Sequence, residues 1–214
     1  MEFERVAIML NTTVLLPNLI LAVAKTIEIN AEELTALDQA IGDGDHVTNL
    51  QRGIQALTAQ SEALSQLDWQ AALQKIGMTV MSSIGGASGS LYGTLFLGMS
   101  KNLQNQPLTL TTFADVFLKG VEAVKQRGKA DRGEKTMLDV LIPVAEQLQK
   151  DANKPDLLEQ IKLIAIAGVE STRDMLATKG RASFLGERSR GHIDAGAKSS
   201  QLIICAIVDA LATT

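Results

Sequence analysis

Aromatic side chains are scarce in this chain of 214 residues: phenylalanine, tyrosine and tryptophan together make up 3%. Residues that favour strands never cluster with the alternating apolar and polar pattern of a half-buried strand. Alanine, leucine, methionine and glutamine are plentiful instead, and these residues suit helices. The composition therefore argues against a sheet-based fold and predicts an all-α protein.

Cysteine and long apolar runs are also nearly absent. Cys205 is the only cysteine, which excludes a disulfide within the chain and is typical of a reducing compartment. The longest apolar stretch, VLLPNLILAVAK, is too short to span a bilayer and is interrupted by Pro17 and Asn18. The first residues show no secretory signal pattern. We therefore expect a cytoplasmic location and no membrane partner.

The chain has no excess of positive charge, since its formal net charge is −4. Extended binding to nucleic acid or to an anionic membrane needs a basic face, so no nucleic-acid partner is expected. Basic residues gather in two short stretches, 125–135 and 180–192. Such stretches are usually solvated, but they could also meet an anionic small ligand or an acidic partner protein.

Helical periodicity recurs along the whole sequence and no stretch resembles an interdomain linker, so we expect a single domain over residues 1–214. Asn30 and Asp68 are predicted N-caps, and Gly180 is predicted to end the longest helix. The predicted helices cover residues 3–10, 14–28, 31–41, 47–60, 69–84, 90–103, 113–128, 137–152, 155–179 and 195–212.

Four segments between or beside these helices are rich in glycine and in hydroxyl or charged side chains. They are GDGDHVTN (42–49), GGASGS (85–90), GKADRGEKT (128–136) and GRASFLGERSRGHIDAGAKSS (180–200). Each segment alone fits an ordinary loop, because turns need glycine. Four of them in one helical chain favour a ligand site built from loops.

The first segment follows Asp38 and contains Asp43 and Asp45. Carboxylates at this spacing can converge on a hard cation, and Mg²⁺ takes a few carboxylates together with phosphate oxygens and water. A calcium EF-hand is excluded, because Thr48 replaces its obligatory glycine and Ile54 its terminal glutamate. Stabilisation of a helix dipole would explain Asp45 but not Asp38, which is near a helix C-terminus. The spacing therefore predicts a Mg²⁺ site.

Two of the segments lead directly into helices, whose first turns present free amides and a positive dipole end. Residues 46–49 and GGASGS are therefore predicted to bind phosphate. His46 is a candidate phosphate contact, whereas the role of His192 stays open. Neither a Walker P-loop nor a Rossmann fingerprint occurs. No nucleophile is paired with a base, so no covalent catalytic residue is predicted.

Together these motifs resemble one known family, the L subunits of dihydroxyacetone kinase (DhaL). The resemblance is carried by GDGDH with an aspartate five residues upstream, GGASG-x-L-x-G, RGKA-x-x-G-x-KTMLD and GRASFLGERS-x-GH-x-D-x-GA-x-S. It runs from about Leu37 to the last helix. Fatty-acid kinase relatives are similar in the first motif but carry threonine where this chain has His46, which favours the dihydroxyacetone branch.

The resemblance implies a closed barrel of about eight antiparallel amphipathic helices with the nucleotide site at one end. It implies ADP or ATP as the nucleotide and two Mg²⁺ ions held by Asp38, Asp43 and Asp45. The other implied contacts are His46, Val47, Thr48, Asn49, Ala87 and Ser88 at the phosphates, Gly128, Met137 and Arg181 at the nucleoside, and Asp194, Ala195 and Gly196 in a closing loop.

The resemblance also implies a function: transfer of a phosphoryl group from Mg-bound nucleotide to dihydroxyacetone held on a separate K subunit. In fused kinases of the family the donor is exchangeable ATP. In three-subunit systems ADP stays bound and is rephosphorylated by a phosphohistidine protein of the phosphotransferase system, which a chain without the K module favours. A regulatory protein that holds nucleotide with little turnover is the alternative. A homodimer is left open.

Two positions depart from the family pattern, since Val47 stands where glycine is usual and Ala195 where proline is usual. A β-branched residue is strained at positive φ, so Val47 would weaken the first loop if that position needs such a backbone. Without proline, the closing loop at Ala195 would be less rigid.

Overall fold

The computed structural model describes residues 12–152 and 154–213, and the predicted helix over 3–10 lies outside them. The described residues form helices and no strand, which confirms the predicted all-α class. The helices are η1 (Thr13–Leu15), α2 (Leu16–Ile29), α3 (Ala31–Ile41), α4 (His46–Thr58), α5 (Ser61–Leu64), α6 (Trp69–Ser83), α7 (Gly86–Leu103), α8 (Leu110–Gly128), α9 (Leu138–Asp151), α10 (Leu157–Ser171), η2 (Arg181–Ser189) and α11 (Ala195–Thr213).

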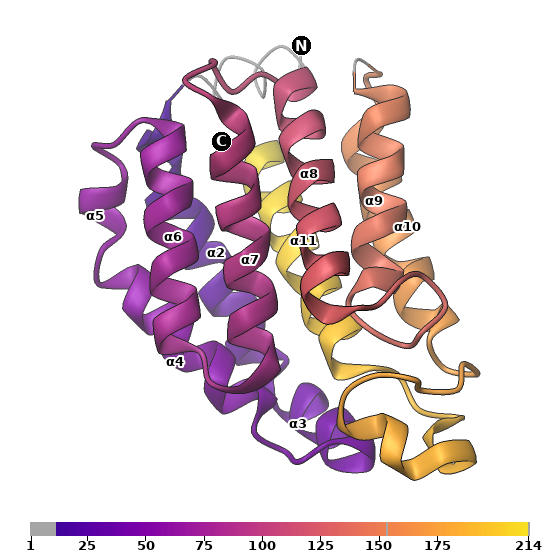
Figure 1. Ribbon diagram of the computed structural model, residues 1–214. Helices are drawn as coiled ribbons and strands as arrows, with labels where there is room; N and C mark the ends of the chain where they lie inside the picture. Colours follow the sequence, from indigo (N-terminus) through magenta and orange to yellow (C-terminus); the bar gives the residue numbers. More distant parts are fainter. Residues whose placement is uncertain (1–11, 153, 214) are drawn as a thin grey trace.

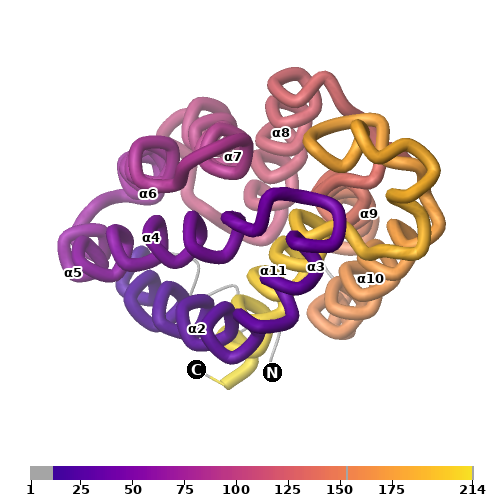
Figure 2. Tube along the Cα trace, turned by 90° about the horizontal axis from the view of Figure 1, so that it is seen from below, coloured from indigo at the N-terminus to yellow at the C-terminus, as the bar shows by residue number. Residues whose placement is uncertain are grey.

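The longer helices close into a ring (Figure 2). Along the chain, α2 packs against α4, α4 against α6, and each later α-helix against the next, until α11 returns to α2. From α6 onwards, consecutive helices of the ring run in opposite directions (Figure 1). This is the antiparallel arrangement that the resemblance implied.

The inside of the ring is apolar, because each helix turns its hydrophobic face inward. Side chains such as Leu50, Ile76, Leu95 and Leu141 line a cavity of about 270 Å³ there. The few aromatic residues gather there as well, since Trp69, Tyr92, Phe96, Phe113 and Phe117 also line this cavity.

Among the described residues, α11 is long and apolar enough to cross a membrane, and so is the bent pair of residues 13–29 and 31–41. These are criteria of length and composition alone. The packing of α11 between α10 and α2 gives its apolar composition a structural reason within the ring.

Helix capping follows the sequence at some ends and departs from it at others. The Asp68 carboxylate accepts a hydrogen bond from the Ala71 amide (2.8 Å), which confirms the predicted cap of α6. Asn30 is the N-cap residue of α3, as predicted, but its side chain does not cap that helix and instead donates back to the Thr26 carbonyl (2.8 Å) at the end of α2. A capping box that includes Thr109 starts α8 earlier than predicted.

The predicted helix over residues 155–179 is wrong at its C-terminal end, since α10 stops at Ser171. Ser171 and Thr172 donate side-chain hydrogen bonds to carbonyls three residues earlier, which competes with continuation of the helix. The carbonyls of Thr172 and Arg173 accept hydrogen bonds from the Lys135 ammonium instead. A tertiary contact therefore ends a helix whose sequence pattern continues.

The alternation of helix directions brings the glycine-rich segments to one end of the ring, at the bottom of Figure 1. Residues 42–45 connect α3 to α4, and residues 84–85 connect α6 to α7. Residues 129–137 connect α8 to α9, and residues 172–194 connect α10 to α11. Segments that are far apart in the sequence therefore share one surface.

Candidate functional site

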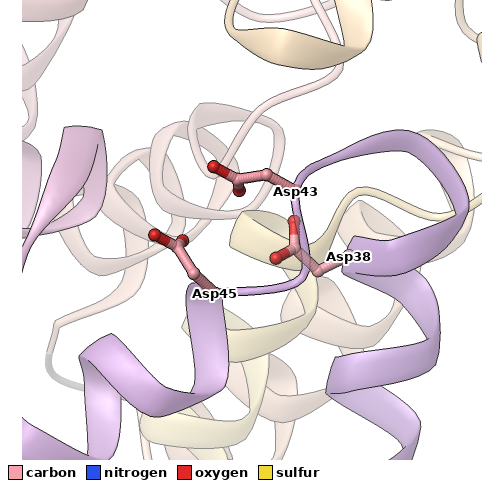
Figure 3. Close-up of side chains that lie close together, drawn as sticks. All are labelled: Asp38, Asp43 and Asp45. Carbon is pink, nitrogen blue, oxygen red and sulfur yellow. The ribbon is translucent and has the colours of Figure 1, made fainter.

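Three carboxylates converge at this end of the ring (Figure 3). Asp38 lies on the last turn of α3, Asp43 in the following loop, and Asp45 immediately before α4. Oxygen atoms of the three lie within 4.8 Å of one another. A Cβ atom on Gly42 would lie 2.0 Å from the Asp38 carboxylate, so only glycine allows this close turn. The predicted ligands are brought together, and their binding of a metal stays a prediction.

The negative charge of this cluster is only partly balanced by neighbouring protein groups. Arg181 Nε lies 2.7 Å from Asp43 Oδ2, and the backbone N–H of His46 donates to Asp38 Oδ2 (3.0 Å). The Arg181 side chain is 71% exposed, so this ion pair contributes little stability in water. A set of three carboxylates with one exposed cation fits Mg²⁺, which prefers oxygen ligands.

The first turns of α4 and α7 lie side by side at the same end. Asn49 is buried between them, and a Cβ atom on Gly85 would lie 2.9 Å from its Oδ1 atom. Gly86, which begins α7, has a φ of 67°. Thr48 and Ala87 are exposed on the two first turns. Thr48 and Ala87 therefore lie at the N-terminal ends of two neighbouring helices, which favour an anion, whereas the His46 amide is already bonded to Asp38.

His46 joins three helices through its side chain. Its Nδ1 lies 3.0 Å from the Ser88 hydroxyl of α7, and its Nε2 lies 2.9 Å from the Ser199 hydroxyl of α11. Burial lowers the pKa of His46, against the opposing charges of the nearby aspartates, and favours the neutral ring. A direct phosphate contact would require the ring to give up one hydroxyl partner. Ser199 was not predicted as a site residue, although it lies in the fourth motif.

Val47 has none of the backbone strain that its departure from the family pattern suggested. It is the second residue of α4 and is absent from the described residues with positive φ. Its side chain is buried with Ile27, Leu34 and Leu202. The backbone strain suggested at Val47 is therefore absent, and its apolar side chain packs at the start of α4.

Replacement of Val47 by glycine is expected to destabilise the protein. The change removes a buried valine side chain and places glycine inside a helix, for a combined loss of about 3 kcal/mol in the free energy of unfolding. Urea denaturation would measure this loss, with Val14→Gly as the control because Val14 is 64% exposed. Equal stability of wild type and Val47→Gly would contradict the assigned packing.

The residues implied at the nucleoside are only partly in contact with one another. Met137 is buried just before α9 and lies beside Gly196, where an added Cβ atom would be 3.7 Å from the Met137 Cβ. Gly128, the last residue of α8, lies beside Ala130 instead. Ala195 is buried as the first residue of α11, so helix geometry fixes its backbone where the family usually has proline.

Asp194 caps α11 and links it to the end of α10. Its Oδ2 accepts a hydrogen bond from the Ala197 amide (2.7 Å), and its own amide donates to Thr172 Oγ1 (3.1 Å). Burial raises the pKa of Asp194 to about 7, although the Ala197 amide and the charge of Lys135 oppose this shift. The carboxyl group is therefore largely protonated in mildly acidic solution.

We expect Asp194 to make the protein less stable as the pH rises from about 5 to 7. Between the ordinary pKa of 3.8 and the folded pKa of about 7, the folded chain binds more protons than the unfolded chain. The slope is at most about 1.4 kcal/mol per pH unit and vanishes above this window. Asp194→Asn keeps an oxygen that can cap α11 but does not titrate. Urea denaturation across this range should give the variant a flatter pH dependence, and equal dependences would contradict the assignment.

Several known proteins are similar in sequence to this chain over most of their length. The DAK2 domain family matches residues 40–209. The ADP-binding subunit DhaL of PEP-dependent dihydroxyacetone kinase 1 from Listeria innocua is 42% identical over 182 residues, which cover 85% of this chain and 88% of that protein. The ADP-binding subunit DhaL of PTS-dependent dihydroxyacetone kinase from Lactococcus lactis is 41% identical over 186 residues, which cover 87% and 91%.

The fold also has a solved counterpart, the crystal structure of the dihydroxyacetone kinase from C. freundii in complex with AMP-PNP and Mg²⁺. The TM-score is 0.72 at 24% identity, over 91% of this chain and 33% of that chain. At this identity the likeness concerns the fold alone. The domain match and the identities to whole subunits decide the family, so this chain belongs to the DAK2-domain family, among the DhaL subunits.

Proposed function

We propose that this chain is the nucleotide-binding subunit of a dihydroxyacetone kinase and works with a separate dihydroxyacetone-binding K subunit. The observation that carries the proposal is the cluster of Asp38, Asp43 and Asp45 beside the adjacent first turns of α4 and α7. Relatives that match over most of their length are named as ADP-binding subunits of such kinases. We also propose that residues 1–214 form one nucleotide-binding domain.

In this proposal Asp38, Asp43 and Asp45 hold two Mg²⁺ ions. Bound Mg²⁺ neutralises charge on the phosphoryl group that is transferred. The amides at the starts of α4 and α7 orient the phosphates, and Arg181 adds positive charge beside Asp43. The acceptor hydroxyl belongs to the partner-bound substrate, so this chain contributes positioning and electrostatic stabilisation.

We infer that ADP stays bound as a coenzyme and is rephosphorylated by a phosphohistidine protein of the phosphotransferase system. The relatives from L. innocua and L. lactis are named PEP-dependent and PTS-dependent, and this chain covers most of their length. Exchangeable ATP is the competing donor. The free thiol of Cys205 accords with the cytoplasmic location in which such a reaction would take place.

Reconstitution tests both parts of the proposal. The purified chain is combined with the K subunit of a related kinase and supplied with ATP or with a phosphorylated phosphohistidine protein. Native mass spectrometry, which also gives the oligomeric state, is expected to detect bound ADP and Mg²⁺. Absence of nucleotide before and after incubation with Mg–ADP would refute nucleotide binding. Product formation from ATP but not from the phosphohistidine protein would overturn the inferred donor.

A further inference from the structure

A buried lysine holds the segment that carries Arg181. The Lys135 side chain is 1% exposed, which is rare for lysine. Its ammonium group donates hydrogen bonds to the carbonyl oxygens of Thr172 (2.5 Å), Arg173 (3.3 Å) and His192. An ammonium group has three donors, and three carbonyls accept them. Lys135 is therefore fully occupied by the protein and is not a ligand for phosphate.

The three acceptors come from both ends of the segment over residues 172–194. Thr172 and Arg173 leave α10, and His192 leads back towards α11. At the same place the Gly191 amide donates to the Arg173 carbonyl (2.8 Å). The ammonium group therefore sits at the stem of the segment, where its outgoing and returning chains meet.

Lys135 is itself held in an unusual backbone conformation, with a φ of 61°. The Asp139 carboxylate, also buried, accepts hydrogen bonds from the Gly133 amide (2.5 Å) and the Thr136 amide (2.8 Å), on either side of Lys135. A non-glycine residue at positive φ costs free energy and persists only where its surroundings fix it. The start of α9 therefore provides a rigid support for the lysine.

Farther along the segment, Ala177 and Ala182 are buried against Ile41 of α3, and the Ala177 amide donates to the buried Ser189 hydroxyl (3.0 Å). The polar contacts with neighbouring segments are more exposed. The Thr178 hydroxyl donates to Glu134 Oε1 (3.0 Å), and Lys179 Nζ lies 3.4 Å from the same atom. At the first turn of η2, Arg181 pairs with Asp43 (2.7 Å). Exposed ion pairs of this kind contribute at most about 1 kcal/mol each. The two ends of the segment are therefore held at the buried stem, while its middle is held by the apolar contacts with α3.

We propose that Lys135 is a positioning residue that fixes both ends of segment 172–194 and thereby places Arg181 beside the carboxylate cluster. Burial of a charge is costly unless every donor is satisfied, and an apolar side chain would fill the same space more cheaply. The fixed position that the ammonium group gives to both ends of the segment thus explains why a charged side chain is buried here. The expected effect on ligand binding rests on the proposed function, whereas the anchoring of the segment does not.

Hydrogen exchange of the ligand-free protein tests the anchoring. Lys135→Met is compared with wild type and with Lys75→Met, which changes an exposed lysine of α6. We expect the amides of Ala177 and Gly191, both hydrogen-bonded within the segment, to exchange at least about tenfold faster in Lys135→Met, with the ring helices unchanged. Wild-type exchange rates in a folded Lys135→Met variant would overturn the proposal.

Mg–ADP binding measured by calorimetry tests the consequence for the site. Lys135→Met is expected to weaken binding at least about tenfold, and Lys75→Met to leave it unchanged. In an Arg181→Gln background the same lysine change should have a smaller effect, because residues that act through one another are not additive. A purely structural role predicts additive effects, and additivity would overturn the proposal.

Lys135→Gln, which keeps two N–H donors, is a milder variant for the same measurements. If Lys135→Met does not fold, we expect Lys135→Gln to fold with faster exchange of the segment and weaker binding. Failure of both variants to fold would overturn the proposal, because it would make the lysine a requirement of the whole ring. A wild-type protein that binds no Mg–ADP would refute the proposed function, while the exchange experiment would still decide the anchoring.

Discussion

Asp45→Asn is expected to abolish Mg²⁺-dependent nucleotide binding, with an affinity for Mg–ADP lower by at least about 100-fold, since it removes a proposed metal ligand. Without ligand, the same variant should unfold at the same temperature as wild type or higher. Three carboxylates within 4.8 Å of one another repel, and the change removes one of them. A lost function with an undamaged fold is the signature of a ligand site.

Asp209→Asn is the matched control, because Asp209 is an exposed aspartate on α11 whose partner is Lys162. Thermal unfolding with and without Mg–ADP measures the effect, since a ligand that binds the native state raises its stability. Wild type and Asp209→Asn should be stabilised, and Asp45→Asn should not. If Asp45→Asn is stabilised as much as wild type, the carboxylate cluster is not the metal site.

Gly89→Ala is expected to lower the stability of the fold strongly. An added Cβ atom would lie 2.0 Å from the backbone oxygen of Ile84 and 2.8 Å from its carbonyl carbon. Alanine normally stabilises a helix relative to glycine, but here the turn before α7 would have to move. Overpacking of this kind costs about 3 kcal/mol, or roughly 6–12 °C in the unfolding midpoint. Displacement of the turn should also weaken Mg–ADP binding, because Ala87 and Ser88 move with it.

Gly128→Ala provides the comparison for stability, because its added Cβ atom would meet nothing closer than 3.5 Å. We expect an unfolding midpoint equal to wild type or slightly higher, as glycine within a helix is unfavourable. Scanning calorimetry measures the unfolding midpoints of both variants. A Gly89→Ala protein as stable as Gly128→Ala would show that the turn accepts a side chain, against the close packing seen at Ile84.

Local features of the chain were predictable because they depend on neighbouring residues. The spacing of Asp38, Asp43 and Asp45 places them on one helix end and the loop that follows it, so their convergence needs few distant contacts. Apolar periodicity and capping residues likewise act within a few turns, which is why the all-α class and the cap at Asp68 follow from the sequence. The glycine-rich segments were identified as the predicted site in the same way.

Contacts between distant segments could not be read from such patterns. The helical periodicity after Ser171 continues in the sequence, but the helix stops where the Lys135 ammonium group, from far earlier in the chain, donates hydrogen bonds to the Thr172 and Arg173 carbonyls. The partners of His46 are equally remote, since Ser88 and Ser199 come from two other helices. Only the assembled ring decides which buried donor meets which acceptor.

The sequence by itself determined the helical class, the glycine-rich segments and the carboxylates that we propose as metal ligands. The tertiary structure alone decided that Val47 packs inward without strain, that the His46 side chain connects α4 to α7 and α11, and that the Lys135 ammonium group is hydrogen-bonded to three carbonyls. The physical reason is the range of the interactions. Helix propensity, capping and close-spaced charges act along the chain, whereas burial and hydrogen-bond satisfaction depend on what the fold brings beside each side chain.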